Sequence, residues 1–220
     1  MSRTHYTGLY VDTETGGTDE RLYALTSICV GAFTLRPDSE PEVQALYLPI
    51  RPPQSLIITE KAAQVQGKTV GQLYTTGEPE SVQMGKLSYW LWNDGLIGLP
   101  VWAHNADFDR RFLSAACDRN YPQWWKPNLN PADQPNIAVC ALAGRDSRWS
   151  CTRYLAEYLV QKGLLEQPRK PDGTPSVSLD PLMERLGIPG RQGEGHDAHE
   201  DVKLGVAVLD ALLRLDGWWG

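Results

Sequence analysis

The chain has 220 residues, of which 41% are hydrophobic, and it carries a formal net charge of −6. This length predicts one domain with a substantial core. The acidic charge argues against a module that coats long nucleic acid through many phosphate contacts, although it leaves room for an enzyme that holds one or two nucleotides through bound metal.

The predicted elements begin with three strands joined by short connections. Apolar and polar residues alternate over 9–14, and residues 26–35 and 43–50 are rich in β-forming side chains. Residues 37–40, Pro-Asp-Ser-Glu, are typical of a turn. We therefore expect an antiparallel meander at the start of the chain.

The rest of the chain alternates helices and strands. Helices are expected at 59–66, 80–93, 107–118, 150–163, 179–186 and 198–215, strands at 99–103 and 137–142, and a loop at 167–178. This order predicts an α/β fold, in which a mixed sheet of three antiparallel strands and then parallel strands is flanked by helices. We expect a single domain over 1–220.

Composition also bears on where the protein works. No apolar stretch reaches the roughly 20 residues that cross a bilayer, and residues 1–7 lack the apolar run of a signal peptide. The four cysteines have no C-x-x-C spacing, so we expect them to be reduced core residues. A cytoplasmic protein without a membrane partner is expected.

The first acidic motif is Asp12-Thr13-Glu14, near the end of the first predicted strand. Side chains two residues apart share a face of a strand and lie roughly 6.5–7 Å apart at the backbone. Two neighbouring carboxylates repel each other unless a cation lies between them. Gly16 and Gly17 then allow the backbone to turn and to approach a ligand closely. The motif predicts a divalent metal site facing a phosphodiester, with a solvated acidic turn as the alternative.

The second acidic motif lies in the segment 102–113, Trp-Ala-His-Asn-Ala-Asp-Phe-Asp-Arg-Arg-Phe-Leu. At helical spacing Asp107 shares a face with Arg111, which predicts a solvated position. Asp109 instead shares its face with Phe112 and other apolar residues, and a carboxylate there needs a partner. Asn105 either caps this helix or directs its amide at a substrate.

The third acidic motif, residues 193–201, opens the last predicted helix. Asp197 as N-cap, with Glu200 three residues later, predicts a capping box. Asp201 flanks the apolar stripe of the helix and is expected to face the sheet. His196 precedes the helix on a glycine-containing loop, where a mobile imidazole is suited to accept a proton from water. His199 is expected to be an exposed first-turn residue.

Together, Asp12-x-Glu14, Asp109 within H-N-A-x-F-D, and His196-x-x-x-x-Asp201 resemble the DEDDh 3′→5′ exonucleases in order and spacing. That family includes the epsilon-type proofreading subunit, ribonuclease T and oligoribonuclease, and the resemblance extends over about residues 8–215. It implies a ribonuclease H-like fold and two Mg²⁺ or Mn²⁺ ions held by Asp12, Glu14, Asp109 and Asp201. It also implies that His196 is the general base. Two departures are a glutamine, Gln66, where relatives often carry histidine, and a predicted strand at 137–142 without the Asp-Thr often found there.

The resemblance implies metal-dependent release of nucleoside monophosphates from the 3′ ends of single-stranded nucleic acid, with DNA favoured over RNA. We expect Thr13, Thr15 and Gly16 to hold the terminal nucleotide, with Asn105 and Phe108 contacting it from the other side. One alternative is an RNA-trimming enzyme of the ribonuclease T or oligoribonuclease type, for which a homodimer is implied. The other is a catalytically silent binding protein of the same fold. No tether to a polymerase partner is evident.

Overall fold

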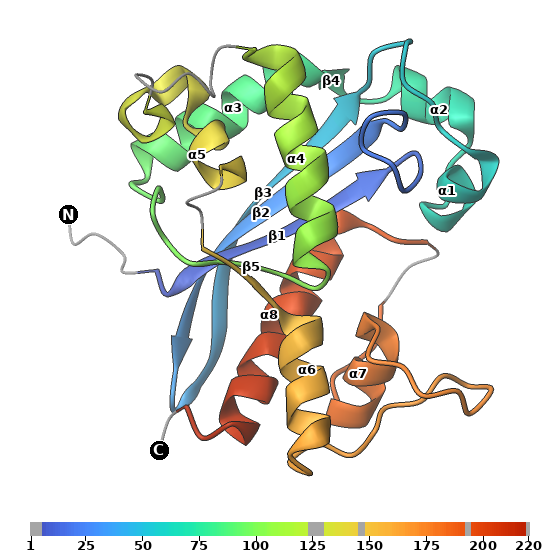
Figure 1. The fold of residues 1–220 in the computed structure, drawn as a ribbon, viewed down its shortest axis with the longest axis vertical. Coiled ribbons are helices and arrows are strands. Elements are labelled where there is room, and N and C mark those ends of the chain that lie inside the picture. The colour runs from blue at the N-terminus through green and yellow to red at the C-terminus, as the bar shows by residue number, and fades with distance from the viewer. Residues whose placement is uncertain (1–5, 123–129, 145–147, 192–194, 219–220) are drawn as a thin grey trace.

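A six-stranded mixed sheet forms the centre of the molecule (Figure 1). The structure is a computed structural model, and it describes residues 6–122, 130–144, 148–191 and 195–218. The strand order is β4-β3-β2-β1-β5-β6. The strands are β1 (Gly8–Thr15), β2 (Leu25–Arg36), β3 (Ser39–Arg51), β4 (Glu78–Pro79), β5 (Val101–Ala103) and β6 (Trp149–Cys151). β1, β2 and β3 pair antiparallel, and β5 and β6 run parallel to β1, which confirms the predicted mixed sheet.

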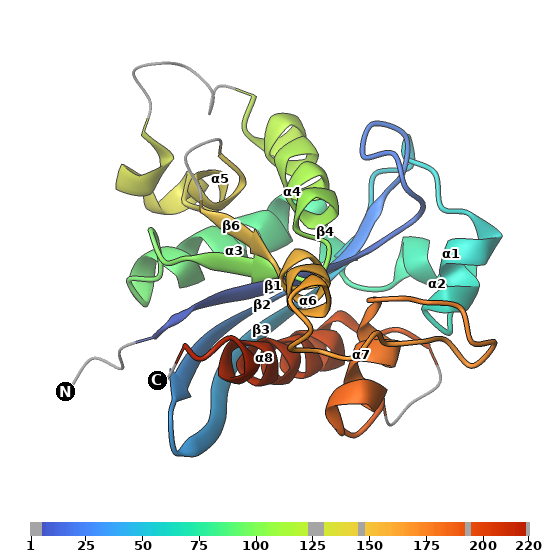
Figure 2. The same ribbon diagram turned by 60° about the horizontal axis from the view of Figure 1, so that its bottom comes forward.

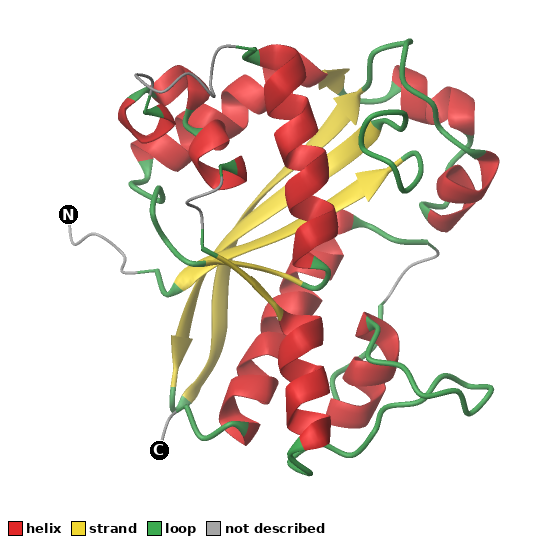
Figure 3. Cartoon of the chain, in the orientation of Figure 1, coloured by secondary structure: helices red, strands yellow, loops and turns green. Residues whose placement is uncertain are grey.

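Helices lie around the strands of the sheet (Figure 3), and they follow the meander along the chain. They are α1 (Glu60–Val65), α2 (Val70–Thr75), α3 (Glu80–Asn93), α4 (Ala106–Asn120), α5 (Val139–Ala143), α6 (Thr152–Gln161), α7 (Leu179–Leu186) and α8 (Ala198–Leu215). The predicted bounds of α3, α7 and α8 agree with the structure to the residue. Local signals define two of these ends: Gly187 leaves α7 in the left-handed conformation, and the Asp197 side chain caps the start of α8.

Helices cover both faces of the sheet (Figure 2). α3, α4 and α5 lie over one face, where Leu9 and Val11 of β1 are buried. α8 lies over the other face, where it packs on Tyr10. The predicted apolar stripe of α8 is buried against this face and consists of Val202, Val206, Leu209 and Leu213. β1 therefore contributes buried side chains to both helical layers.

The predicted strand at 137–142 is wrong. The segment forms a short 3-10 turn, Pro135–Ile137, followed by the helix α5, and it packs against α3 and α4. A short apolar run does not distinguish a buried strand from a buried helix, and its alanines favour the helix. The last parallel strand is instead β6, at the beginning of the segment that we expected to be entirely helical.

The cysteines are unpaired in the structure. Cys29, Cys117 and Cys140 are free and buried, as predicted, whereas the free Cys151 is only partly buried. Within the described parts of the chain, no helix combines the length and the apolar character that crossing a membrane requires.

Candidate active site

The end of β1 is open on one side because β5 is short. β5 pairs only with Leu9 and Tyr10 and ends at Ala103, so the β1 backbone beyond them has no strand partner there. α4 fills this position: Asp109 Oδ1 accepts hydrogen bonds from the backbone N–H of Thr13 at 3.0 Å and from its hydroxyl at 2.8 Å. The predicted partner of the buried Asp109 carboxylate is therefore the β1 backbone itself.

Asp107 is the contrasting aspartate on α4. Its side chain is 65% exposed and forms ion pairs with Arg110 and Arg111 along the helix surface. This confirms the division of the two aspartates between a solvated face and a core face. Helical spacing alone was sufficient for this prediction.

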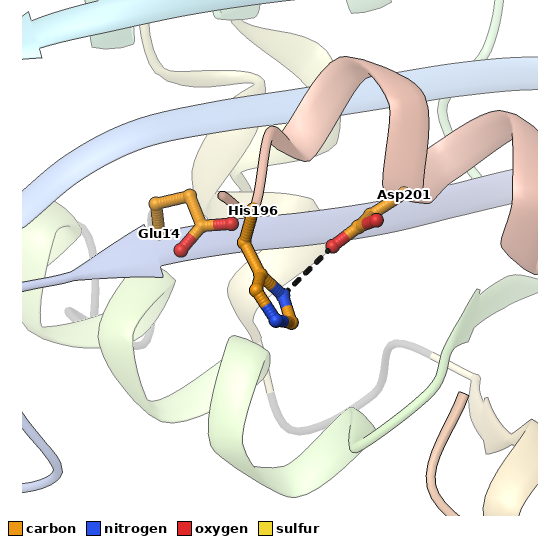
Figure 4. A group of neighbouring side chains, drawn as sticks. All are labelled: Glu14, His196 and Asp201. Carbon is orange, nitrogen blue, oxygen red and sulfur yellow. Dashed lines mark ion pairs between the residues drawn. The ribbon is translucent and has the colours of Figure 1, made fainter. Parts of the chain in front are cut away.

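Asp201 reaches the site from the opposite helical layer. The first turn of α8 is fixed by the Asp197 side chain, which accepts hydrogen bonds from the backbone N–H groups of His199 and Glu200. Asp201 is buried and faces the sheet, as predicted. The His196 ring contacts it, with 3.3 Å between Nδ1 and Asp201 Oδ2 (Figure 4).

His199, expected to be exposed, is partly buried and lies with its ring centroid 6.2 Å from that of Tyr47.

Three of the five predicted active-site side chains lie close together. One side-chain oxygen or nitrogen from each of Glu14, His196 and Asp201 lies within 4.8 Å of the other two (Figure 4). Burial raises the pKa of Asp12 well above its ordinary value, and the charges of Asp109, Glu14 and Asp201 raise it further. Asp12 is thus electrostatically part of the same carboxylate cluster.

Burial disfavours the ionised form of two further carboxylates of the cluster. Burial raises the pKa of Glu14 to about 7, against a smaller lowering effect of His196. Burial also raises the pKa of Asp109 to about 7, despite its hydrogen bonds from Thr13. Four carboxylates that interact electrostatically, together with the adjacent imidazole, form an oxygen-rich donor set, which fits hard divalent cations such as Mg²⁺ or Mn²⁺.

The position of His196 depends on the end of α1. Its backbone N–H donates to the Val65 carbonyl at 2.7 Å. The preceding Gly195 has a φ of +91°, and a Cβ there would lie 2.7 Å from the Gly67 nitrogen. Only glycine therefore allows the loop to pass so close to α1. α1 ends at Val65, one residue before the predicted end, and Gly67, the predicted stop, follows the Gln66 cap with a φ of +63°.

Thr13, Thr15 and Gly16 are buried, and their polar groups have partners within the protein. Thr13 donates to Asp109, and the Thr15 carbonyl accepts a hydrogen bond from the side chain of Gln66 at 3.0 Å. The Gly16 N–H donates to the Ala24 carbonyl, and a Cβ at Gly16 would lie 2.3 Å from the Ile57 carbonyl oxygen. The close approach that Gly16 permits is thus to the chain itself, and contact of these three residues with substrate stays a prediction.

Asn105 and Phe108 lie on the other side of the site, at the start of α4. Asn105 occupies the N-cap position of α4 but forms no side-chain capping bond, and it is exposed. It borders a cleft of about 590 Å³ between α6 and the 167–178 loop. Phe108 is partly buried and packs on Phe112 with 4.9 Å between ring centroids. Asn105 is therefore the more accessible of the two predicted substrate contacts.

Sequence reasoning missed Arg191, which contacts Asp201 from the loop between α7 and α8. It also identified Gln66 only as a departure from relatives, without its role beneath β1. The arginine carried no local signal, because nothing in a glycine-containing loop indicates which carboxylate a side chain will meet. For Gln66, the cue was its position just before the glycine that ends α1.

The fold places the molecule among known structures. A product-bound exonuclease I matches 98% of this chain and 46% of its own, with a TM-score of 0.69 and 18% identity. Escherichia coli exonuclease I in complex with a dT13 oligonucleotide matches with a TM-score of 0.66 and 18% identity, covering 96% of this chain and 42% of its own. Exonuclease I from Methylocaldum szegediense matches with a TM-score of 0.64 and 19% identity, covering 94% of this chain and 40% of its own.

These likenesses establish a ribonuclease H-like fold, which confirms the predicted fold class. The chain spans less than half the length of the exonuclease I structures that it matches. No protein-family model matches the sequence, and no curated protein sequence is significantly similar to it. The case for a particular activity therefore rests on the site.

Proposed function

We propose that the chain is a metal-dependent 3′→5′ exonuclease of the DEDDh type, acting on the 3′ ends of single-stranded DNA. The observation that carries the proposal is the convergence of Glu14, His196 and Asp201, from separate parts of the chain, with Asp12 and Asp109 in the same electrostatic cluster. Placing several carboxylates together is electrostatically unfavourable, and a bound cation offsets this repulsion.

The four carboxylates of Asp12, Glu14, Asp109 and Asp201 are the groups that would hold two Mg²⁺ or Mn²⁺ ions. Bound there, the ions would supply activation of a water molecule and charge relief for the departing 3′ oxygen. The protein fixes these donors in advance: Asp109 through its hydrogen bonds to Thr13, and Asp201 through the capped first turn of α8. This preorganisation supports a catalytic function over a solvated acidic turn.

His196 is suited to the role of general base. Its Nδ1 is directed at Asp201, which favours the tautomer with the proton on Nδ1 and leaves Nε2 to accept a proton. The hydrogen bond to Asp201 raises the pKa of His196 above its ordinary value, although burial opposes this. The side chain is 43% exposed, so water reaches it. In the proposed reaction Nε2 takes the proton of the attacking water.

The preference for DNA rests on the similar structures, several of which are exonuclease I bound to oligodeoxynucleotides. The test is a gel assay with 5′-labelled single-stranded DNA and RNA of matched sequence, with Mg²⁺, Mn²⁺ or chelator. We expect a metal-dependent ladder that shortens from the 3′ end, with DNA degraded faster. Faster degradation of RNA would favour the exoribonuclease alternative.

The control is the Asp12→Ala protein, which should fold and leave both polymers intact. Equal shortening by the variant would indicate a contaminating nuclease. No cleavage by the wild type with either metal would contradict the proposed activity and favour the silent binding protein. Binding of the labelled oligonucleotides, measured by fluorescence anisotropy, would then identify that role.

A further inference from the structure

Arg191 is the cation most directly engaged with the carboxylate cluster in the described part of the chain. Its Nε donates to Asp201 Oδ1 at 2.6 Å and its Nη2 donates to Asp201 Oδ2 at 3.1 Å. This two-point contact uses both oxygens of the carboxylate. The arginine side chain is 12% exposed, so solvent screens the pair only weakly.

The same guanidinium contacts a second carboxylate. Its Nη1 also donates to Asp180 Oδ1, at the start of α7. The two aspartates differ in their surroundings, because the side chain of Asp180 is 62% exposed whereas that of Asp201 is 5% exposed. Arg191 thus links a buried carboxylate of the site to an exposed one outside it.

There is space beside the guanidinium on the Asp180 side. A cavity of about 560 Å³ lies between the first turns of α7 and the Arg191 loop, and its lining includes Asp180, Arg191 and His196. A side chain that leaves Asp201 therefore has both room and a remaining partner. No other described arginine or lysine has a hydrogen bond or ion pair to Asp201.

Arg191 donates to both oxygens of Asp201, and Oδ2 also lies 3.3 Å from His196 Nδ1. A divalent ion that takes Asp201 as a ligand therefore competes with the guanidinium for the lone pairs and the charge of an already engaged carboxylate. The proposed function requires such an ion, and the present inference rests on it. The geometry of Arg191 makes it a competitor for the same oxygens.

We propose that Arg191 is an internal counter-ion of the metal site, which neutralises Asp201 in the metal-free protein and shifts onto Asp180 when a divalent ion binds. The guanidinium then remains beside the site, in the cavity that it lines with His196. Asp180 acts through Arg191 and is a positioning residue.

The inference makes opposite predictions for two variants. Arg191→Ala removes the competitor and leaves the cluster more negative, so Mn²⁺ should bind about tenfold more tightly, a change of about 1.4 kcal/mol. Asp180→Ala removes the alternative partner, so Arg191 is held on Asp201 alone and Mn²⁺ should bind several-fold more weakly. A purely structural role of either residue would weaken binding in both variants.

The experiment is titration of the metal-free protein with Mn²⁺, followed by calorimetry and by the electron paramagnetic resonance signal of free Mn²⁺. Arg191→Lys, which retains the charge but not the two-point contact, should bind with intermediate affinity. Arg185→Ala is the matched control, because Arg185 is an α7 arginine that pairs with Glu166 away from the site. Its affinity should equal that of the wild type.

Circular dichroism establishes that each variant is folded before titration. Unchanged or weaker Mn²⁺ binding by a folded Arg191→Ala protein would overturn the inference, while leaving the exonuclease assay to decide the proposed function. If neither the wild type nor Arg191→Ala bound Mn²⁺, both the inference and the proposed metal dependence would fall. If Arg191→Ala did not fold, the ordered affinities of Arg191→Lys and Asp180→Ala would decide the outcome.

Discussion

The contact between β1 and α8 has two ends with opposite chemistry. At one end Tyr10 packs against Gly205 of the helix, and both are buried among apolar side chains. At the other end, two and four residues further along β1, Asp12 and Glu14 interact electrostatically with Asp201 of the same helix. One strand and one helix therefore build a dry core and a charged site in direct continuity.

The two ends differ in how their groups are satisfied. The phenol of Tyr10 has a buried partner, the hydroxyl of Thr152 at 3.2 Å, and its ring fills the space above Gly205. The carboxylates at the other end repel one another, and burial raises the pKa of Asp12 and Glu14. The packed end stabilises the fold, and this stability offsets the unfavourable charges that the site requires.

The largest effect should come from Asp12→Asn, which removes one charge and keeps the shape of the side chain. Exonuclease activity should fall by at least the roughly 10²–10³-fold that loss of one electrostatic group in a catalytic site costs. The melting temperature of the metal-free protein should rise, since one of the mutually repelling carboxylates is gone. Kinetics with Mg²⁺ and calorimetry in chelator measure the two quantities. A lower melting temperature would show that the carboxylate cluster stabilises the fold, which would contradict the contrast between a stabilising packed end and an unfavourable charged end.

Gly205→Ala tests the packed end. The added Cβ would lie 2.3 Å from ring atoms of Tyr10, so the ring or the helix must shift. Overpacking of this kind costs roughly 1–3 kcal/mol, and the close contact places this site at the upper end, about 3 kcal/mol. Urea denaturation measures the free energy of unfolding, and activity per folded molecule should change far less than in Asp12→Asn.

The matched control is Gly85→Ala on α3, where a Cβ would have no heavy atom within 4 Å. Alanine is favoured over glycine in a helix by about 1 kcal/mol, so this variant should be slightly more stable than the wild type. Similar stability changes in both variants would mean that the contact between Tyr10 and Gly205 is not tight.

The sequence predicts local features of the fold and of the site better than features that depend on packing. The spacing of Asp12, Glu14 and Asp109 follows from strand and helix periodicity, which is local information. The strand expected at 137–142 failed because a short buried apolar run fits either structure, and only packing against α3 and α4 decides between them. Sequence reasoning missed the pairing of Arg191 with Asp201 for a related reason, because a contact made from a loop has no periodicity that predicts it.

The acidic end should make the stability of the metal-free protein depend on pH. The pKa values of Glu14 and Asp109 rise from ordinary values of 4.5 and 3.8 to about 7. In this interval the folded protein binds more protons than the unfolded chain, so stability should fall as pH rises from about 4.5 to 7 and stay low above it. The raised pKa of His196 acts in the same direction at slightly higher pH.

Because these groups titrate together, we expect a total loss of a few kcal/mol, which is less than the sum that the two pKa shifts would give separately at about 1.36 kcal/mol per pKa unit. For a chain of this size that lowers the melting temperature by roughly 2–4 °C per kcal/mol. Calorimetric scans in chelator from pH 5 to pH 8 measure the effect. Saturating Mn²⁺ should abolish it, and a rise in stability over this interval in chelator would contradict the assignment of unfavourable charge to this end.

The smallest effect should come from Gln66→Ala, which tests how the charged end is held in place. The side chain is buried, accepts a hydrogen bond from the Thr26 hydroxyl at 2.9 Å and donates one to the Thr15 carbonyl at 3.0 Å. Loss of these bonds should destabilise the protein by about 1 kcal/mol. Because Thr15 directly follows Glu14, activity should also fall, by less than tenfold and through kcat more than KM. Gln72→Ala, at the exposed N-terminal turn of α2, removes a comparable amide away from the site and should leave kcat unchanged. Equal kcat values for Gln66→Ala and the wild type would show that β1 holds its carboxylates without support from α1.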